Sequence, residues 1–383
     1  MNKNNILIIC CCVVFAFAGC KKDSVDYRYP QPYAGQLATL PGVAGTELGI
    51  NAANSVFVDF SKGVVTPVRR ANWDLGLYPG ADFKVILNHT MGALAFDTKK
   101  TDFAKVLQAD SIAIAASLQL NAAGSGLLVD PVTGTPTDYL AKLVTLEVGE
   151  NEDASKIYII NSGYAGVPPF TNAIPATPTT PAIPSIPLKR PWYKVKVYKG
   201  NNGYVVKYAS MSNDNPAFTP RTVNKDLSYN FNVFSFTNLS AVGEPAKSLW
   251  DIEWTWTTSK NADGTIATAT HDFVLINFLG GVTAAEVKIV DQAAKEYENF
   301  NKDKLAGLTY LNTREAIGVK WRSLTSDDRP IVNRDRFYVV KDAEGNVYKL
   351  RFVSSSNADG GVIGTPVIEY RLVDAAITPG NTQ

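Results

Sequence analysis

Residues 250–256 read Trp-Asp-Ile-Glu-Trp-Thr-Trp, and residues 73–75 read Trp-Asp-Leu. Both stretches alternate bulky apolar with polar side chains, and this period of two predicts β-strands. Trp254 and Trp256 then lie on one face of their strand. Such a face either stacks on a ligand or packs in a β-sandwich core, and the core is the commoner use.

The surroundings of the two Trp-Asp stretches occur in the same order. A strand precedes each stretch, and a strand ending in Asn follows it; next come a glycine turn, a helix-like segment and a hairpin with Gly-x-x-x-Lys spacing. The paired features are strands 56–60 and 233–236, Asn88 and Asn277, helical segments 102–116 and 283–305, and hairpin residues Lys207 and Lys349. This shared order predicts an internal duplication.

The predicted fold is mainly β with a few short helices, arranged as two related β-sandwich-like units. The first unit covers residues 51–215 and the second covers residues 222–375. Residues 166–191 contain eight prolines. Because proline cannot donate to a strand ladder, this segment is expected to be an extended loop.

Asp74 and Asp251 follow the repeated tryptophans. An acid at the same place in both repeats is expected to cap a turn or accept backbone hydrogen bonds rather than to catalyse.

The N-terminus has the features of an export signal. Lys3 is followed by an apolar run over residues 6–18, too short to span a bilayer permanently, and by Gly19-Cys20. This pattern predicts a signal peptide over residues 1–19, and its Ala-Gly-Cys ending resembles the lipobox of bacterial lipoproteins. The resemblance implies a lipid on Cys20 that attaches the chain to a membrane. Residues 20–50, which begin with Lys21-Lys22-Asp23 and are later rich in Pro, Gly and Ala, are expected to be a tether that favours display at the outer membrane or cell surface.

Composition excludes several classes of function. The 37 basic and 36 acidic side chains give a net charge of +1, so no basic excess is available to attract nucleic acid. The other three cysteines lie inside the predicted signal peptide, which excludes thiol catalysis and disulfides in the mature chain. The common hydrolase, metalloprotease and nucleotide-binding motifs are also absent. The sequence therefore predicts a binding module and not an enzyme.

The combination of lipobox, Trp-Asp strands, strands ending in Asn88 and Asn277, and the hairpin over residues 338–352 resembles the HmuY-like family of haem-binding lipoproteins. The resemblance occurs twice along the chain. It implies a mostly β, outer-membrane-anchored haem scavenger that passes haem to a transporter. The family's axial ligands do not map onto this sequence, and Tyr78 stands where one would be sought.

Scarcity of suitable side chains narrows the haem-ligand candidates. Haem iron takes His, Met, Cys or Tyr, and His89 and Met91 share a turn at the end of a strand, where a rigid β scaffold usually presents binding groups. We expect one of these two to be an axial ligand, with Met211, His271 and Tyr78 as further candidates. The alternative function is a surface glycan- or protein-binding module without haem.

Overall fold

The strand signatures of the sequence form strands in the structure, a computed structural model that describes residues 31–44, 52–165, 188–214 and 218–376. The predicted signal peptide, Cys20 and most of the proline-rich loop lie outside the described residues. Within the described residues the fold is mainly β, and no helix exceeds six residues. The predicted fold class, mainly β with a few short helices, is confirmed. No helix in this part of the chain is long and apolar enough to cross a membrane.

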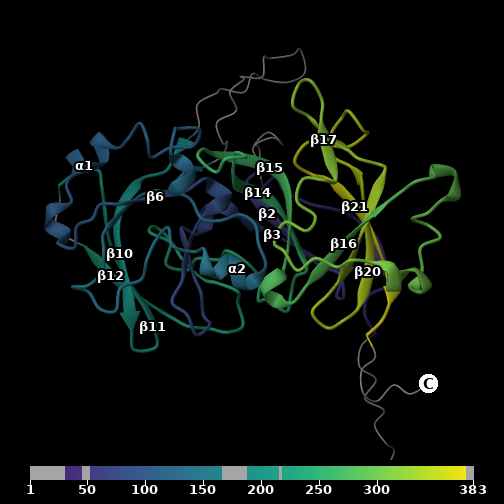
Figure 1. Ribbon diagram of the computed structural model, residues 1–383, viewed down its shortest axis with the longest axis horizontal. Coiled ribbons are helices and arrows are strands. Elements are labelled where there is room, and N and C mark those ends of the chain that lie inside the picture. Colours follow the sequence, from purple (N-terminus) through teal and green to yellow (C-terminus); the bar gives the residue numbers. More distant parts are fainter. Residues whose placement is uncertain (1–30, 45–51, 166–187, 215–217, 377–383) are drawn as a thin grey trace, which may run out of the picture. The chain divides into compact units, whose positions relative to one another are not determined.

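The elements follow one another along the chain with these bounds (Figure 1). The strands are β1 (Gly35–Thr39), β2 (Asn54–Asp59), β3 (Val64–Arg69), β4 (Leu75–Leu77), β5 (Val85–Leu87), β6 (Leu94–Asp97), β7 (Tyr158–Asn161), β8 (Tyr164–Ala165), β9 (Leu188–Lys189), β10 (Trp192–Gly200), β11 (Gly203–Ser210), β12 (Thr219–Asn224), β13 (Asn232–Phe234), β14 (Ile252–Lys260), β15 (Ala267–Ile276), β16 (Thr283–Lys288), β17 (Arg322–Leu324), β18 (Pro330–Val332), β19 (Arg336–Lys341), β20 (Val347–Ser354) and β21 (Val367–Asp374). The helices are α1 (Gln108–Ala113), α2 (Pro136–Ala141) and the 3₁₀ segments η2 (Arg70–Asn72), η3 (His89–Met91), η4 (Phe103–Lys105), η5 (Ser125–Leu127), η6 (Phe278–Gly280), η7 (Gln292–Ala294) and η8 (Lys302–Gly307).

The strands pair in antiparallel sheets. Two five-stranded sheets have the orders β6-β7-β10-β11-β12 and β16-β19-β20-β21-β1. Smaller sheets have the orders β15-β14-β2-β3 and β13-β4-β5, and two strand pairs, β17-β18 and β8-β9, complete the set.

The two predicted units exchange strands. Strand β2 of the first unit pairs with β14 of the second unit. Strand β13 of the second unit pairs with β4 of the first unit. Figure 1 shows β2 and β14 side by side although they are far apart in the sequence. The hydrophobic core likewise draws on both units, because Phe60, Trp254 and Tyr338 belong to one buried cluster. Residues 51–215 and 222–375 are therefore interleaved in the sheets.

Asp74 and Asp251 occupy matching places where these exchanged strands meet. The Oδ2 atom of Asp251 accepts the Phe60 N–H at 2.7 Å, and Oδ2 of Asp74 accepts the Phe236 N–H at 2.8 Å. Each aspartate N–H also donates to the residue two positions before that phenylalanine. The predicted role of both aspartates as backbone acceptors is confirmed.

Asn88 and Asn277 also make the same contacts. The Oδ1 atom of each residue accepts a backbone N–H of its own turn, from Thr90 at 3.1 Å and from Gly280 at 3.0 Å. Their Nδ2 groups donate to the carbonyls of Arg70 and Trp73 in the first turn and of Lys247 and Trp250 in the second. In both turns these acceptors are the tryptophan and the residue three positions before it. A common origin of the two units stays a prediction that these matched contacts support.

The hairpin lysines do not match as predicted. Lys349 lies on β20, the third strand from β16, and its Nζ donates to the carbonyls of Tyr297, Glu298 and Phe300. The third strand from β6 is β10, where Lys194 donates to the carbonyls of Phe103 and Val106. By position in the sheet, Lys349 therefore corresponds to Lys194 on β10 and not to Lys207 on β11. Equal Gly-x-x-x-Lys spacing does not identify the strand in the sheet.

Two further expectations need correction. Residues 283–305 were expected to be a helix-like segment. Instead, Thr283–Lys288 forms β16 and pairs with β19 along its whole length. The tether was expected to run to residue 50, but Gly35–Thr39 forms β1, the edge strand that pairs with β21. In both cases the segment pairs with the backbone N–H and C=O groups of a neighbouring strand. Local composition does not show where such unpaired groups will lie.

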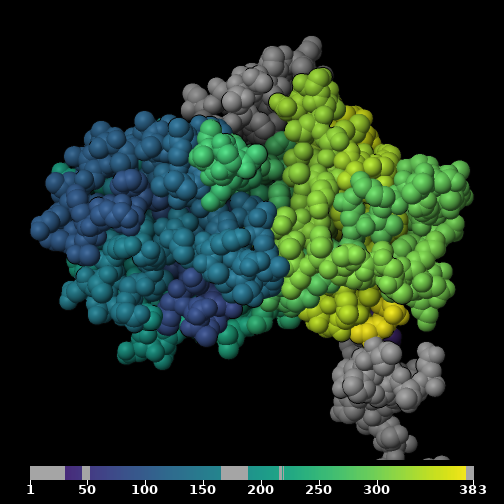
Figure 2. Space-filling view, viewed as in Figure 1, coloured from purple at the N-terminus to yellow at the C-terminus, as the bar shows by residue number. Residues whose placement is uncertain are grey.

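The hairpin of β14 and β15 extends over the first unit. The N–H groups of Asn121 and Gly126 donate to carbonyls of Ala267 and Thr265 near its tip, at 2.8 and 3.0 Å. Figure 2 shows this tip lying against first-unit atoms. This hairpin therefore places β15 side chains beside the first unit.

Candidate functional site

A β-bulge positions His271. Between the pairs Thr255↔Phe273 and Thr257↔Thr270, one residue of β14, Trp256, faces two residues of β15, His271 and Asp272. Asp272 has φ +51°, the left-handed conformation that Asp tolerates better than most residues. Bulges of this kind re-aim side chains and are frequent beside functional sites.

The imidazole of His271 is oriented by its neighbours on both sides. Its Nδ1 lies 2.5 Å from Oδ2 of Asp272, and its ring centroid lies 5.2 Å from that of Trp256. The side chain is 15 % exposed, so solvent reaches it at the surface of the bulge. A carboxylate bonded to one imidazole nitrogen fixes the orientation of the ring, as in most histidines that bind metals in proteins.

Residues from a later segment hold the bulge in place. The Nη2 atom of Arg322 donates to the carbonyl of His271 at 2.6 Å, and its Nε lies 3.8 Å from Oδ2 of Asp272. The indole N–H of Trp321 donates to the carbonyl of Asp272 at 3.0 Å. These contacts give His271 a rigid support.

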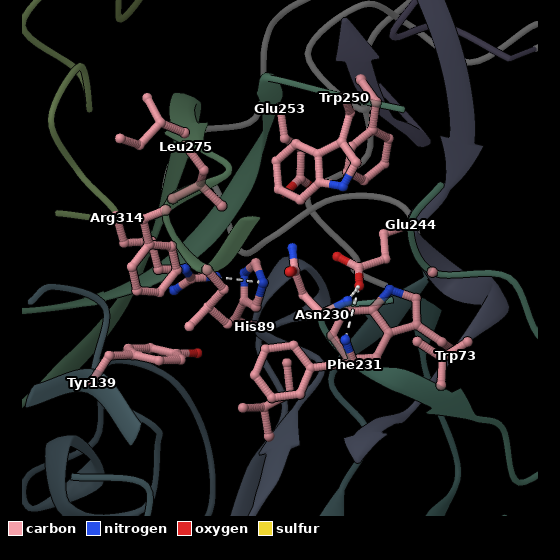
Figure 3. A pocket seen from close by; sticks show the side chains of 17 residues that line it. Trp73, His89, Tyr139, Asn230, Phe231, Glu244, Trp250, Glu253, Leu275 and Arg314 are labelled. Atoms are coloured by element: carbon pink, nitrogen blue, oxygen red, sulfur yellow. Dashed lines mark hydrogen bonds between the residues drawn. The ribbon is translucent and has the colours of Figure 1, made fainter. Parts of the chain in front are cut away.

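His89 lies in the interior with both ring nitrogens engaged. Its Nε2 accepts a hydrogen bond from Nη2 of Arg314 at 2.7 Å, and its Nδ1 lies 3.1 Å from Oγ1 of Thr257 (Figure 3). Because arginine only donates, Nε2 is the acceptor, and the ring is neutral with its proton on Nδ1. Burial, and then the charge of Arg314, lower the pKa of His89 well below its usual value. The lone pair that iron would need is used inside the protein.

The remaining haem-ligand candidates lie in or against the core. Met91 is 4 % exposed, with Sδ 4.0 Å from Nη1 of Arg70. Met211 is equally buried in a separate apolar cluster with Leu94 and Ile159. Tyr78 is partly buried and packs against the ring of Phe231. Trp256 lines one small cavity together with His89 and Met91. It also lines a separate small cavity together with His271.

A third cavity, of about 60 Å³, lies where the two matched turns meet. The repeated tryptophans Trp73 and Trp250 both line it, and so do Glu244 and Arg314 (Figure 3). One oxygen of Glu244, Oε1, accepts the backbone N–H groups of Asn230 and Phe231, each at 2.8 Å. Burial, and then the nearby charge of Glu253, raise the pKa of Glu244 to about 8.

The pKa of Glu244 predicts how stability depends on pH. The folded state holds this proton up to about pH 8, whereas an ordinary glutamate loses it near 4.5. Unfolding therefore releases a proton between these values, and stability falls as pH rises through this window, by at most about 1.4 kcal/mol per pH unit. We expect Glu244→Gln to flatten this slope in urea unfolding at pH 5, 6, 7 and 8. Equal slopes in both proteins would refute this assignment.

Comparison with known proteins identifies the family. The model of the HmuY protein family matches residues 51–370 in one span. The chain belongs to the HmuY family. Members are haem-binding surface proteins without enzymatic activity, so the prediction that the chain is not an enzyme is confirmed. No curated protein and no solved structure matches the chain.

The HmuY match spans both predicted units together, so it neither separates them nor tests their duplication. Among the described residues, no three His, Cys, Asp or Glu side chains are grouped to hold a metal ion. The HmuY family binds haem, whose iron takes axial side chains and does not need such a group. The bulge that presents His271 was missed from sequence; the His-Asp dipeptide within a strand was the signal available.

Proposed function

We propose that this HmuY protein binds haem at the cell surface, attached by a lipid on Cys20, and passes haem to a transporter. Membership of the HmuY family carries the haem part of this proposal. The lipid anchor rests on the sequence ending in Gly19-Cys20. We also propose that the two units arose by duplication, on the strength of the matched aspartate and asparagine contacts.

Within this proposal, His271 is an axial ligand of the haem iron. Iron in haem takes imidazole readily, and the carboxylate of Asp272 increases the basicity of the ring and fixes its tautomer. His271 is presented at a bulge with 15 % of its side chain exposed, whereas Met91 and Met211 are buried in the core. His89 would first have to break its bond to Arg314. We therefore propose His271, at the bulge, as the ligand in place of the residues in the turn of His89.

The glycan- or protein-binding alternative rested on the proline-rich loop, most of which lies outside the described residues, and on exposed aromatic side chains of a strand. Trp254 and Trp256 are 1 % and 3 % exposed and pack inside the protein. Their burial supports the core role and leaves no stacking face on β14 for a sugar ring.

Haemin titration tests the proposed function. Adding haemin to the purified mature chain should produce a shifted Soret band that saturates at one haem per chain. A flat difference spectrum would contradict haem binding, and binding to an immobilised surface glycan instead would favour the alternative.

A further inference from the structure

The cavity between the two tryptophan turns has the composition of a binding site separate from His271. Its volume of about 60 Å³ is room for about four water-sized groups, since one water needs roughly 15 Å³ of such cavity volume. The rings of Phe57, Trp73, Phe231 and Trp250 line it, together with the carboxyl groups of Glu244 and Glu253. Both units contribute to this lining, and ligand sites are frequent at such junctions.

Trp250 supplies a hydrogen-bond donor without a partner. The residue is 6 % exposed, and its indole N–H has no acceptor among the described residues. Figure 3 shows this nitrogen on the cavity side of the ring, facing Asn230 and Glu244. Buried indole N–H groups usually find an acceptor, so this orientation points to an oxygen within the cavity.

Glu244 is an acid without a counter-charge. Among the described residues it forms no ion pair, and the charge that acts on it is that of another acid, Glu253. Glu253, in contrast, has cations nearby: the charges of Arg314 and Arg70 act to lower its pKa. Arg314 also donates a hydrogen bond to His89. In the empty site this unpaired acid is mostly protonated near neutral pH, and an entering ammonium group would form an ion pair with it as it ionises. Aromatic rings around a carboxylate are the usual surroundings of a bound ammonium group.

We propose that this cavity binds a short primary amine carrying a hydroxyl group, of the ethanolamine class. Its ammonium group would pair with Glu244, and its oxygen would accept the N–H of Trp250. The aromatic rings would enclose the two methylene groups. The cavity has no room for a phosphate ester, so the free amine and not a lipid headgroup is the ligand. Glu244 keeps partial solvent exposure, which provides access from the surface.

Isothermal titration calorimetry with ethanolamine tests this site on the mature chain. Saturable binding of one molecule per chain is expected, at least about tenfold weaker in Glu244→Gln and several-fold weaker in Trp250→Phe. Propylamine should bind more weakly than ethanolamine because it lacks the oxygen, and glycerophosphoethanolamine should not bind. The exposed acid Glu298, which pairs with Arg351, provides the control variant Glu298→Gln with unchanged affinity.

Three outcomes would overturn the proposal: no saturable heat with ethanolamine, equal affinity in folded Glu244→Gln, or equal affinity for propylamine. The first would mean that the cavity holds only water. If Glu244→Gln fails to fold by circular dichroism, Trp250→Phe and the propylamine comparison still decide. Haemin binding is measured separately in the same samples, so failure of one site is distinguishable from failure of the other.

Discussion

Replacing His271 by Ala should weaken haem binding by at least about 100-fold and remove the Soret shift at micromolar haemin. The reason is that the variant loses the proposed iron ligand, and no other His, Met, Cys or Tyr lines the cavity beside His271. Asp272→Asn should weaken binding by about 10- to 100-fold, the usual cost of losing a carboxylate behind a ligating imidazole. Asn also tolerates the left-handed backbone of residue 272.

His89→Gln is the matched control for this experiment. Glutamine can both donate and accept, so it can replace the contacts of His89 with Thr257 and Arg314. We expect haem affinity to stay within about threefold of the wild type. The ligand assignment would be reversed if His89→Gln, or the double change His89→Ala plus Met91→Ala, abolished the Soret shift while His271→Ala retained it.

Replacing Cys20 by Ala should move the protein from the membrane fraction to the soluble fraction. Each buried methylene of an acyl chain contributes about 0.8 kcal/mol to membrane affinity, so loss of the lipid removes the anchor. Detergent phase partitioning of cell extracts measures the change. Cys12→Ala, within the predicted signal peptide, is the control and should leave the protein in the membrane. Full membrane retention of Cys20→Ala would refute the lipoprotein prediction.

Local sequence patterns predicted the strands but not which strands pair with each other. The period of two located β2, β10 and β14, and the shared order of features led to the matched roles of Asp74 and Asp251. The exchange of β2 and β13 between units could not be read from the sequence, because pairing over such separations depends on which sheet edge is open. The same limit explains why Thr283–Lys288 was mistaken for a helix.

For the candidate site, too, the sequence predicted the residue types but not their long-range contacts. Counting His and Met residues placed His271 among the candidates, but sequence reasoning preferred His89 because it follows a strand in a turn. Two features reversed that order: Arg314, far along the chain, occupies Nε2 of His89, and one additional residue on β15 creates the bulge of His271. A distant hydrogen-bond donor has no local sequence signature, and the bulge had only the His-Asp dipeptide within a strand as its signal.

The central claim, that His271 ligates haem iron in this HmuY protein, is tested most directly by pulsed electron paramagnetic resonance of the ferric haem complex. The chain has only two histidines, so labelling with ¹⁵N-histidine in the His89→Gln variant marks His271 alone. If His271 ligates the iron, the axial-ligand nitrogen coupling changes from ¹⁴N to ¹⁵N on labelling. A haem complex whose spectrum is the same with and without the label would contradict it.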